Sequence, residues 1–130
     1  MNTIIRHRGP DGEGFILFGA DSSIYTAGGN DTSAEVWSNF TPYKPMLNIT
    51  GIENSNIKVA FGHRRLFFID LSPLGHCPMS YDHNKYWITY NGEIYNYLEL
   101  KNELIELGHS FILHTDTEVI LGIISEIKKE

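Results

Sequence analysis

Four short polar segments carry residue types that can bind an amino acid and polarise its side-chain amide. An arginine such as Arg65 can grip an α-carboxylate with a bidentate fork, and a carboxylate such as Asp116 can balance an α-ammonium group. Asn91, followed by the backbone N–H of Gly92, can stabilise the oxyanion of a tetrahedral intermediate. The four segments are residues 7–12, 63–66, 91–96 and 115–118.

Each of these features also has a purely structural interpretation. An aspartate near a helix start, as at Asp116, often caps the helix or faces the positive end of its dipole. Arg65 can be a structural salt-bridge partner. Asn91-Gly92 alone is typical of a hairpin turn. The spacing of single residues therefore leaves both interpretations open.

Hydrophobic patterning predicts the strands that position these segments. Strands are predicted over residues 15–18, over 57–62 with continuation towards Leu66, and over 86–90 with an end at Asn91-Gly92. A short strand is also expected at 111–113, and residues 67–69 are apolar enough to be buried on both sides. Residues 21–56 are rich in polar and small residues and are interpreted as a surface excursion.

Three helices are expected. A short one is predicted near residues 34–37, and a longer one starts at Asn96, where Glu99 completes a capping-box pattern, and stops at Gly108. A third helix follows a cap formed by Thr115 with Glu118. The core-facing residues expected on the last two helices are Tyr97, Leu100, Leu104 and Leu107, and Val119, Ile120, Ile123, Ile124 and Ile127.

Composition limits the classes of partner. The 130 residues indicate one domain, and the net charge of −6 argues against nucleic acid or an anionic membrane as a partner. The single cysteine, Cys77, allows no intrachain disulfide. No apolar stretch reaches the ~18 residues of a membrane span, no signal peptide is evident, and a cytoplasmic location is expected. No metal-ligand spacing is evident, so no metal is expected.

The same polar segments carry a family resemblance. The blocks HRGPDGEG, GHRRLFFIDLSPLGHCPM, YNGEIYNYLELKNELIELGH and TDTEV occupy residues 7–14, 62–79, 90–109 and 115–119. Together, in this order, they resemble the amidotransferase domain of glutamine-dependent asparagine synthetases. The segment RRLFFIDLS is of the synthetase type and differs from the corresponding segment of other class II amidotransferases.

The resemblance implies a fold and a domain organisation. The fold is α+β, part of the αββα sandwich of N-terminal-nucleophile hydrolases, with antiparallel sheets. Residues 1–130 are interpreted as a partial type 2 glutamine amidotransferase domain with the surface excursion at about 21–56. The first strand and the C-terminal synthetase domain of the family are expected to be absent.

The resemblance also implies residue roles. Arg65 matches the arginine that binds the glutamine α-carboxylate, and Asp116 matches the carboxylate that recognises the α-ammonium group. Asn91 and the N–H of Gly92 match the oxyanion hole. The remaining substrate-binding positions are Leu66, Phe68 and Glu93.

The family's reaction begins with nucleophilic catalysis. An N-terminal cysteine thiolate attacks the glutamine carboxamide, ammonia leaves, and a thioester is hydrolysed to glutamate. The ammonia then serves an ATP-dependent synthetase domain in the same chain, which amidates aspartate as a carbon–nitrogen ligase. The resemblance implies no cofactor in the glutaminase domain itself and places ATP and Mg²⁺ in the synthetase domain.

The chain departs from the family at the nucleophile. The family begins with Cys-Gly-Ile, whereas only six residues precede His7 here and none of them is cysteine. Cys77 lies in a proline-rich loop and has no free α-amine to act as a base. We therefore expect no glutamine hydrolysis by this chain alone. The alternative is a non-catalytic glutamine-binding or interaction module that keeps Arg65, Asn91 and Asp116 for binding.

Overall fold

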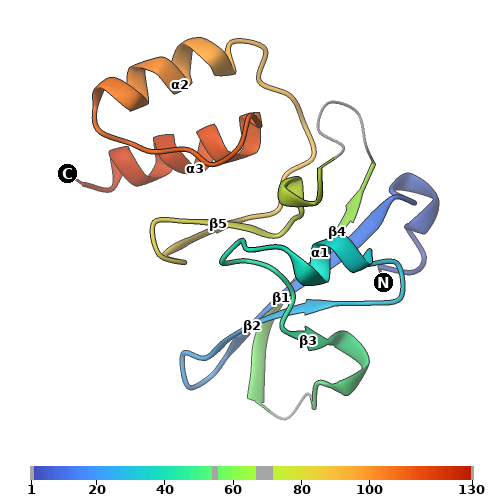
Figure 1. Ribbon diagram of the computed structural model, residues 1–130. Coiled ribbons are helices and arrows are strands. Elements are labelled where there is room, and N and C mark those ends of the chain that lie inside the picture. Colours follow the sequence, from blue (N-terminus) through green and yellow to red (C-terminus); the bar gives the residue numbers. More distant parts are fainter. Residues whose placement is uncertain (1, 54–55, 67–71, 130) are drawn as a thin grey trace.

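The computed structural model describes residues 2–53, 56–66 and 72–129. They form a mixed α/β fold with a four-stranded sheet and a separate two-stranded hairpin. Figure 1 shows two helices lying together above the hairpin, with the larger sheet on its other side. The expected phenylalanine-rich segment at 67–69 falls outside the described residues.

The four-stranded sheet has the order β3-β2-β1-β4 and is antiparallel except at one edge. The central strand β1 (Gly12–Gly19) pairs antiparallel with β2 (Ile24–Gly28) and with β4 (Ile57–Arg65). The short strand β3 (Leu47–Asn48) pairs parallel with β2. The strands predicted at 15–18 and 57–62 are confirmed, and β4 ends at the arginine of the second polar segment.

The description of residues 21–56 as a surface excursion is wrong for β2. The end of this strand is buried, and Ala27 is fully so. Thr26 accepts a hydrogen bond from the backbone N–H of Met46, which lies just before β3. The buried residues Thr26, Ala27 and Gly28 give little hydrophobic signal in the sequence. They are buried because they are small, not because they are strongly apolar. The remaining elements are the helix α1 (Ala34–Ser38), which confirms the short helix predicted there, and the 3-10 turn η2 (Ile49–Gly51).

The hairpin consists of β5 (Met79–Tyr81) and β6 (Tyr86–Ile88). The strand predicted over 86–90 therefore ends earlier, and Asn91-Gly92 forms no hairpin turn. The chain reverses instead between β5 and β6. Two further 3-10 turns, η1 (Arg6–Arg8) and η4 (Pro73–Gly75), precede β1 and β5.

The hairpin and the last helix enclose the main apolar cluster. Its buried members come from four separate parts of the chain, which ties the loop after α1 to the C-terminal helix. These members are Tyr43, Cys77, Met79, Leu113 and Leu121. Trp87 and Ile88 of β6 pack against them.

The helix α2 (Tyr97–Glu106) starts and stops where the sequence indicates, but its cap differs. Asn96 occupies the N-cap position without a side-chain hydrogen bond, so the expected capping box with Glu99 does not form. Its backbone (φ −96°, ψ 25°) is not the extended conformation that aims a capping side chain at the helix. Gly108 has φ +92° and terminates the helix as predicted. Leu104 alone is buried in α2, so the expected stripe is only partly core-facing.

The helix α3 (Asp116–Ile127) begins at the predicted cap, where the Thr115 hydroxyl accepts the N–H of Glu118 at 3.3 Å. Its buried face is rotated from the predicted stripe. Ile124 and Ile127 are exposed, whereas Leu121, Gly122 and Ser125 are buried along with Val119. The rotation arises because α3 packs on the hairpin and α2 together. No helix in the described part of the chain is long and apolar enough to cross a membrane.

The strand expected at 111–113 is absent. Residues 109–115 form an irregular connection between α2 and α3. The backbone N–H groups of Ile112 and Leu113 bond to the Glu118 carboxylate instead of to a neighbouring strand. An apolar run predicts burial, but it does not say which group will satisfy the backbone.

Candidate functional site

One cavity of about 260 Å³ lies where the end of β4, the segment after β6 and the start of α3 converge. The stretch 75–79 also lines it, so four segments that are distant in sequence share one pocket. All of the predicted site residues that the structure describes border it. They are Arg65, Leu66, Asn91, Gly92, Glu93 and Asp116. Phe68 lies outside the described residues.

The cationic wall of the pocket is Arg65, the last residue of β4. It is half-buried, and its Nη1 donates to the Ser72 carbonyl at 2.8 Å. The preceding residue, Arg64, directs its guanidinium to Asp31 at 2.7 Å and is almost completely buried. Both arginines are among the residues that line the pocket, but side chains alternate along a strand, and the guanidinium of Arg64 is bound to Asp31.

The anionic wall is Asp116, the first residue of α3. Its Oδ2 accepts the backbone N–H of Ile94 at 2.9 Å, which ties the segment after β6 to the helix start. Its Oδ1 lies 3.4 Å from the Thr117 hydroxyl. The carboxylate therefore both organises the pocket and borders it.

The predicted oxyanion pair lies in the segment that Asp116 holds. Asn91 and Gly92 are exposed, as is Glu93. A Cβ on Gly92 would lie 2.5 Å from the hydroxyl of Tyr90 and 2.7 Å from its Cζ. An added Cβ would therefore force the tyrosine ring to move, and the absence of a side chain leaves the backbone of Gly92 accessible.

Cys77 borders the same pocket but is unsuited to nucleophilic attack. Its residue is only 5% exposed, and burial raises the pKa of the thiol to about 11. Arg65 lowers this pKa and Asp116 raises it, which shows that both charged walls lie close to the sulfur. A thiol with this pKa is protonated at neutral pH, and the thiolate is the reactive form.

Two histidines stand beside the arginine. Burial, together with the positive charge of Arg65, lowers the pKa of His63 and of His76 to about 4. Both imidazoles are therefore neutral at physiological pH. The arginine keeps a neighbourhood without competing cations, which suits a site for a carboxylate.

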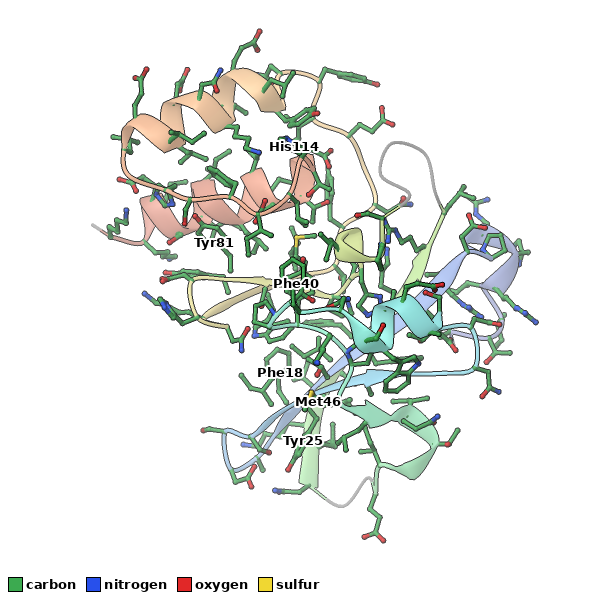
Figure 2. The ribbon with its side chains drawn as sticks, in the orientation of Figure 1. Phe18, Tyr25, Phe40, Met46, Tyr81 and His114 are labelled. Carbon is green, nitrogen blue, oxygen red and sulfur yellow. The ribbon has the colours of Figure 1, made fainter. Side chains whose placement is uncertain are left out.

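Other pocket residues were not assigned a role in the site by sequence reasoning. Tyr90, Tyr97 and Met79 supply apolar surface, and His114 and Thr115 precede Asp116. Figure 2 labels His114 at the N-terminal end of α3. Four of the five lie inside or directly beside the four polar segments, so proximity to these segments was the available signal, whereas Met79 of β5 lies apart from them. Within residues 2–53, 56–66 and 72–129, no group of three or more histidine, cysteine or acidic residues can hold a metal ion.

The arrangement fits a small zwitterion. A cation and an anion border one cavity, and an amide side chain with an accessible glycine backbone lies in its wall. Comparison with known protein families agrees with this chemistry. Residues 48–130 match the family described as the glutamine amidotransferase domain.

Individual relatives extend this match. A glutamine-hydrolysing asparagine synthetase of Bacillus subtilis is 49% identical over 72 residues, which are 55% of this chain and 11% of that protein. A second one from the same organism is 42% identical over 81 residues, 58% of this chain and 13% of that protein. An amidophosphoribosyltransferase of Methanothermobacter thermautotrophicus is 31% identical over 124 residues, covering 93% and 24% of the two chains.

The chain thus spans at most about a quarter of the length of these three relatives. No solved structure matches it. The family match covers residues 48–130, which include the β4 arginines, the Asn91-Gly92 segment and the start of α3. The resemblance that the four blocks indicated is confirmed, and the chain belongs to the glutamine amidotransferase domain family.

Proposed function

We propose that this chain is the glutamine-recognition part of an asparagine synthetase glutaminase domain. In this proposal Arg65 binds the α-carboxylate of glutamine and Asp116 binds its α-ammonium group. Asn91 and the N–H of Gly92 face the carboxamide, and Leu66, Phe68 and Glu93 complete the substrate contacts. The observation that carries the proposal is the presence of Arg65 and Asp116 on one cavity with the Asn91-Gly92 segment.

Titration calorimetry with L-glutamine tests the recognition step. We expect saturable binding that Arg65→Ala weakens about 10- to 100-fold, while the variant keeps its urea unfolding midpoint. Glutarate, which has neither the α-ammonium group nor the carboxamide, is the control ligand and should bind far more weakly. Equal binding of glutarate, or an affinity for glutamine that Arg65→Ala leaves unchanged, would contradict the assignment of this pocket.

We further propose that the 130-residue chain by itself does not hydrolyse glutamine. Cys77 is the only cysteine among the 130 residues, and it is buried with a pKa near 11. Its α-nitrogen lies in a peptide bond and cannot serve as the base that an N-terminal cysteine supplies. Glutamate release above that of a Cys77→Ala control would overturn this part of the proposal.

Adding the missing nucleophile distinguishes a glutaminase domain from a non-catalytic binding module, because only the glutaminase domain should then hydrolyse glutamine. In the family the nucleophile precedes the first matched block, so we propose that fusing this segment from a Bacillus subtilis relative to the chain restores hydrolysis. Such a fusion also supplies the strand that the αββα sandwich of N-terminal-nucleophile hydrolases places in its sheets. Glutamine binding without hydrolysis by a folded fusion would favour the binding module.

The wider activity follows from the names of two relatives. We propose that ammonia from glutamine serves the ATP- and Mg²⁺-dependent amidation of aspartate, and that the reaction takes place in the cytoplasm. When the chain is joined to a synthetase domain and a nucleophile, glutamine labelled at its amide nitrogen should yield labelled asparagine. Label in a different amide product would identify another acceptor.

A further inference from the structure

The segment that precedes Asp116 is held by one buried carboxylate in the first turn of α3. Glu118 is 5% exposed, and each of its two oxygens accepts a backbone N–H. Oε1 accepts from Ile112 at 2.9 Å, and Oε2 accepts from Leu113 at 2.8 Å. These residues stand in the irregular connection between α2 and α3, where no strand supplies partners.

Two more contacts complete this anchor. The carbonyl of Leu113 accepts the ammonium group of Lys101 at 2.6 Å, and the hydroxyl of Thr115 accepts the N–H of Glu118 at 3.3 Å. The backbone on both sides of His114 is thereby fixed to α2 and α3. Figure 2 shows His114 at this point, at the N-terminal end of α3.

The anchor continues into the pocket through Asp116. This residue begins α3 two positions before Glu118, and its Oδ2 accepts the N–H of Ile94. A shift of the 112–115 segment would therefore move the first turn of α3 and the Asp116 carboxylate with it. Displacements of this size matter for binding, because charged hydrogen bonds depend steeply on distance and angle.

We propose that Glu118 is a positioning residue that fixes Asp116 and so sets the preference of the pocket for ligands with an α-ammonium group. This inference rests on the proposed function and adds a residue to which the sequence pattern assigned only a helix cap. Glu118 touches no ligand in this account and acts through the backbone of residues 112–115.

Glutamine at position 118 is the sharpest test of the proposal. It has the size of glutamate, but its amide nitrogen can only donate, so one of the two backbone N–H groups loses its acceptor. A matched control is Glu126→Gln on the same helix, because Glu126 pairs with His109 and Lys129 and does not border the pocket.

The experiment compares two ligands by calorimetry. One is L-glutamine, and the other is glutaramate, which is glutamine without its α-ammonium group. We expect Glu118→Gln to weaken L-glutamine binding about 5- to 20-fold and to change glutaramate binding by less than about twofold. The Glu126→Gln control should keep the preference of the unaltered chain for L-glutamine.

A spectroscopic signal separates positioning from general damage. The amide resonance of Ile94 reports its bond to Asp116, so we expect it to move in Glu118→Gln and to stay in place in Glu126→Gln. Should Glu118→Gln fail to fold, Lys101→Met removes the other anchor of the same segment. Lys101→Met should weaken the binding of L-glutamine about 2- to 5-fold without weakening that of glutaramate, and it should shift the Ile94 resonance.

The outcomes distinguish a failure of the positioning role from a failure of the proposed function. If the folded Glu118→Gln variant keeps its full preference and the Ile94 resonance is unmoved, the positioning role is wrong and the proposed function stands. If Glu118→Gln does not fold, Lys101→Met takes its place. An unchanged preference for L-glutamine and an unmoved Ile94 resonance in Lys101→Met would then show that the positioning role is wrong. If the unaltered chain binds no glutamine, the proposed function fails and the positioning role falls with it.

Discussion

The two arginines at the end of β4 are neighbours in sequence and differ in almost everything else. Arg64 is almost fully buried and pairs with Asp31 at 2.7 Å and with Glu13 at 3.6 Å. Arg65 is half-buried, donates to the Ser72 carbonyl, and borders the cavity that Asp116 also borders. One side chain belongs to a closed ionic cluster, and the next belongs to a pocket.

This difference teaches how one short motif serves both fold and site. Alternation along a strand sends successive side chains to opposite faces, so a His-Arg-Arg run must divide its roles. His63 falls on the face of Arg65, whose charge lowers its pKa. The comparison therefore predicts that changes at position 64 alter stability and changes at position 65 alter affinity.

Replacing Arg64 should give the largest effect. Arg64→Ala leaves Glu13 and Asp31 without their buried cation, and we expect a loss of about 3 to 5 kcal/mol in the free energy of unfolding. Arg6 also bonds to Asp31, but its side chain is 61% exposed, so Arg6→Ala should cost under about 1 kcal/mol. Urea unfolding of both variants measures the difference. Equal losses of stability in Arg64→Ala and Arg6→Ala would contradict the structural role assigned to Arg64.

Replacing Arg65 should leave the fold intact and weaken binding. The loss of its charged contacts to a carboxylate corresponds to a decrease of about 10- to 100-fold in glutamine affinity. Calorimetry measures the affinity, and urea unfolding should show a change below about 1 kcal/mol. A stability loss as large as that of Arg64→Ala would remove the contrast between the two faces.

Acid should protonate His63 and His76, the two histidines near Arg65, and so destabilise the fold. Their pKa is about 4 in the folded chain, against an ordinary value of 6.5, so the unfolded chain binds more protons between these values. Stability is therefore full above pH 6.5 and falls as the pH decreases towards 4. We expect each of the two histidines to contribute a loss of about 1.5 to 2 kcal/mol between pH 6.5 and 5, above the range where most carboxylates titrate.

The pair of variants His63→Gln and His76→Gln tests this origin. Each should flatten the pH dependence of the urea midpoint, whereas His83→Gln, in the exposed hairpin turn, should leave it unchanged. A midpoint that falls equally in all three variants would assign the acid sensitivity to other groups.

The sequence indicated which polar residues lie together better than it predicted the elements around them. The residue types alone left the roles of Arg65, Asn91, Gly92 and Asp116 open, and the family resemblance grouped them. All four border one cavity, and their roles there stay a prediction. Burial of β2 was missed because its packing depends on the absence of side chains rather than on their hydrophobicity. Whether such small residues are buried depends on the tertiary contacts of the folded chain, not on their own hydrophobicity.

The connection at 111–113 shows a second limit. Its apolar run predicted a strand, but the backbone partners come from the carboxylate of Glu118, which the pattern indicated only as a cap residue. Likewise, the buried face of α3 turned away from the most regular stripe because it meets two elements at once. Local patterns indicate that a segment is buried, and tertiary packing selects the partner.

The smallest expected effect concerns the wall of the pocket opposite the arginines. Gly92 is exposed, yet a methyl group there would overlap the end of the Tyr90 ring. Because the ring can swing away, we expect Gly92→Ala to cost only about 1 kcal/mol in stability. The displaced ring should nevertheless reshape the pocket and lower glutamine affinity. Tyr90→Leu removes the overlapping ring atoms, so adding it to Gly92→Ala should cause no further loss of stability from the clash. A double-mutant cycle measures that coupling, and two strictly additive losses would show that ring overlap is not what requires glycine at this wall.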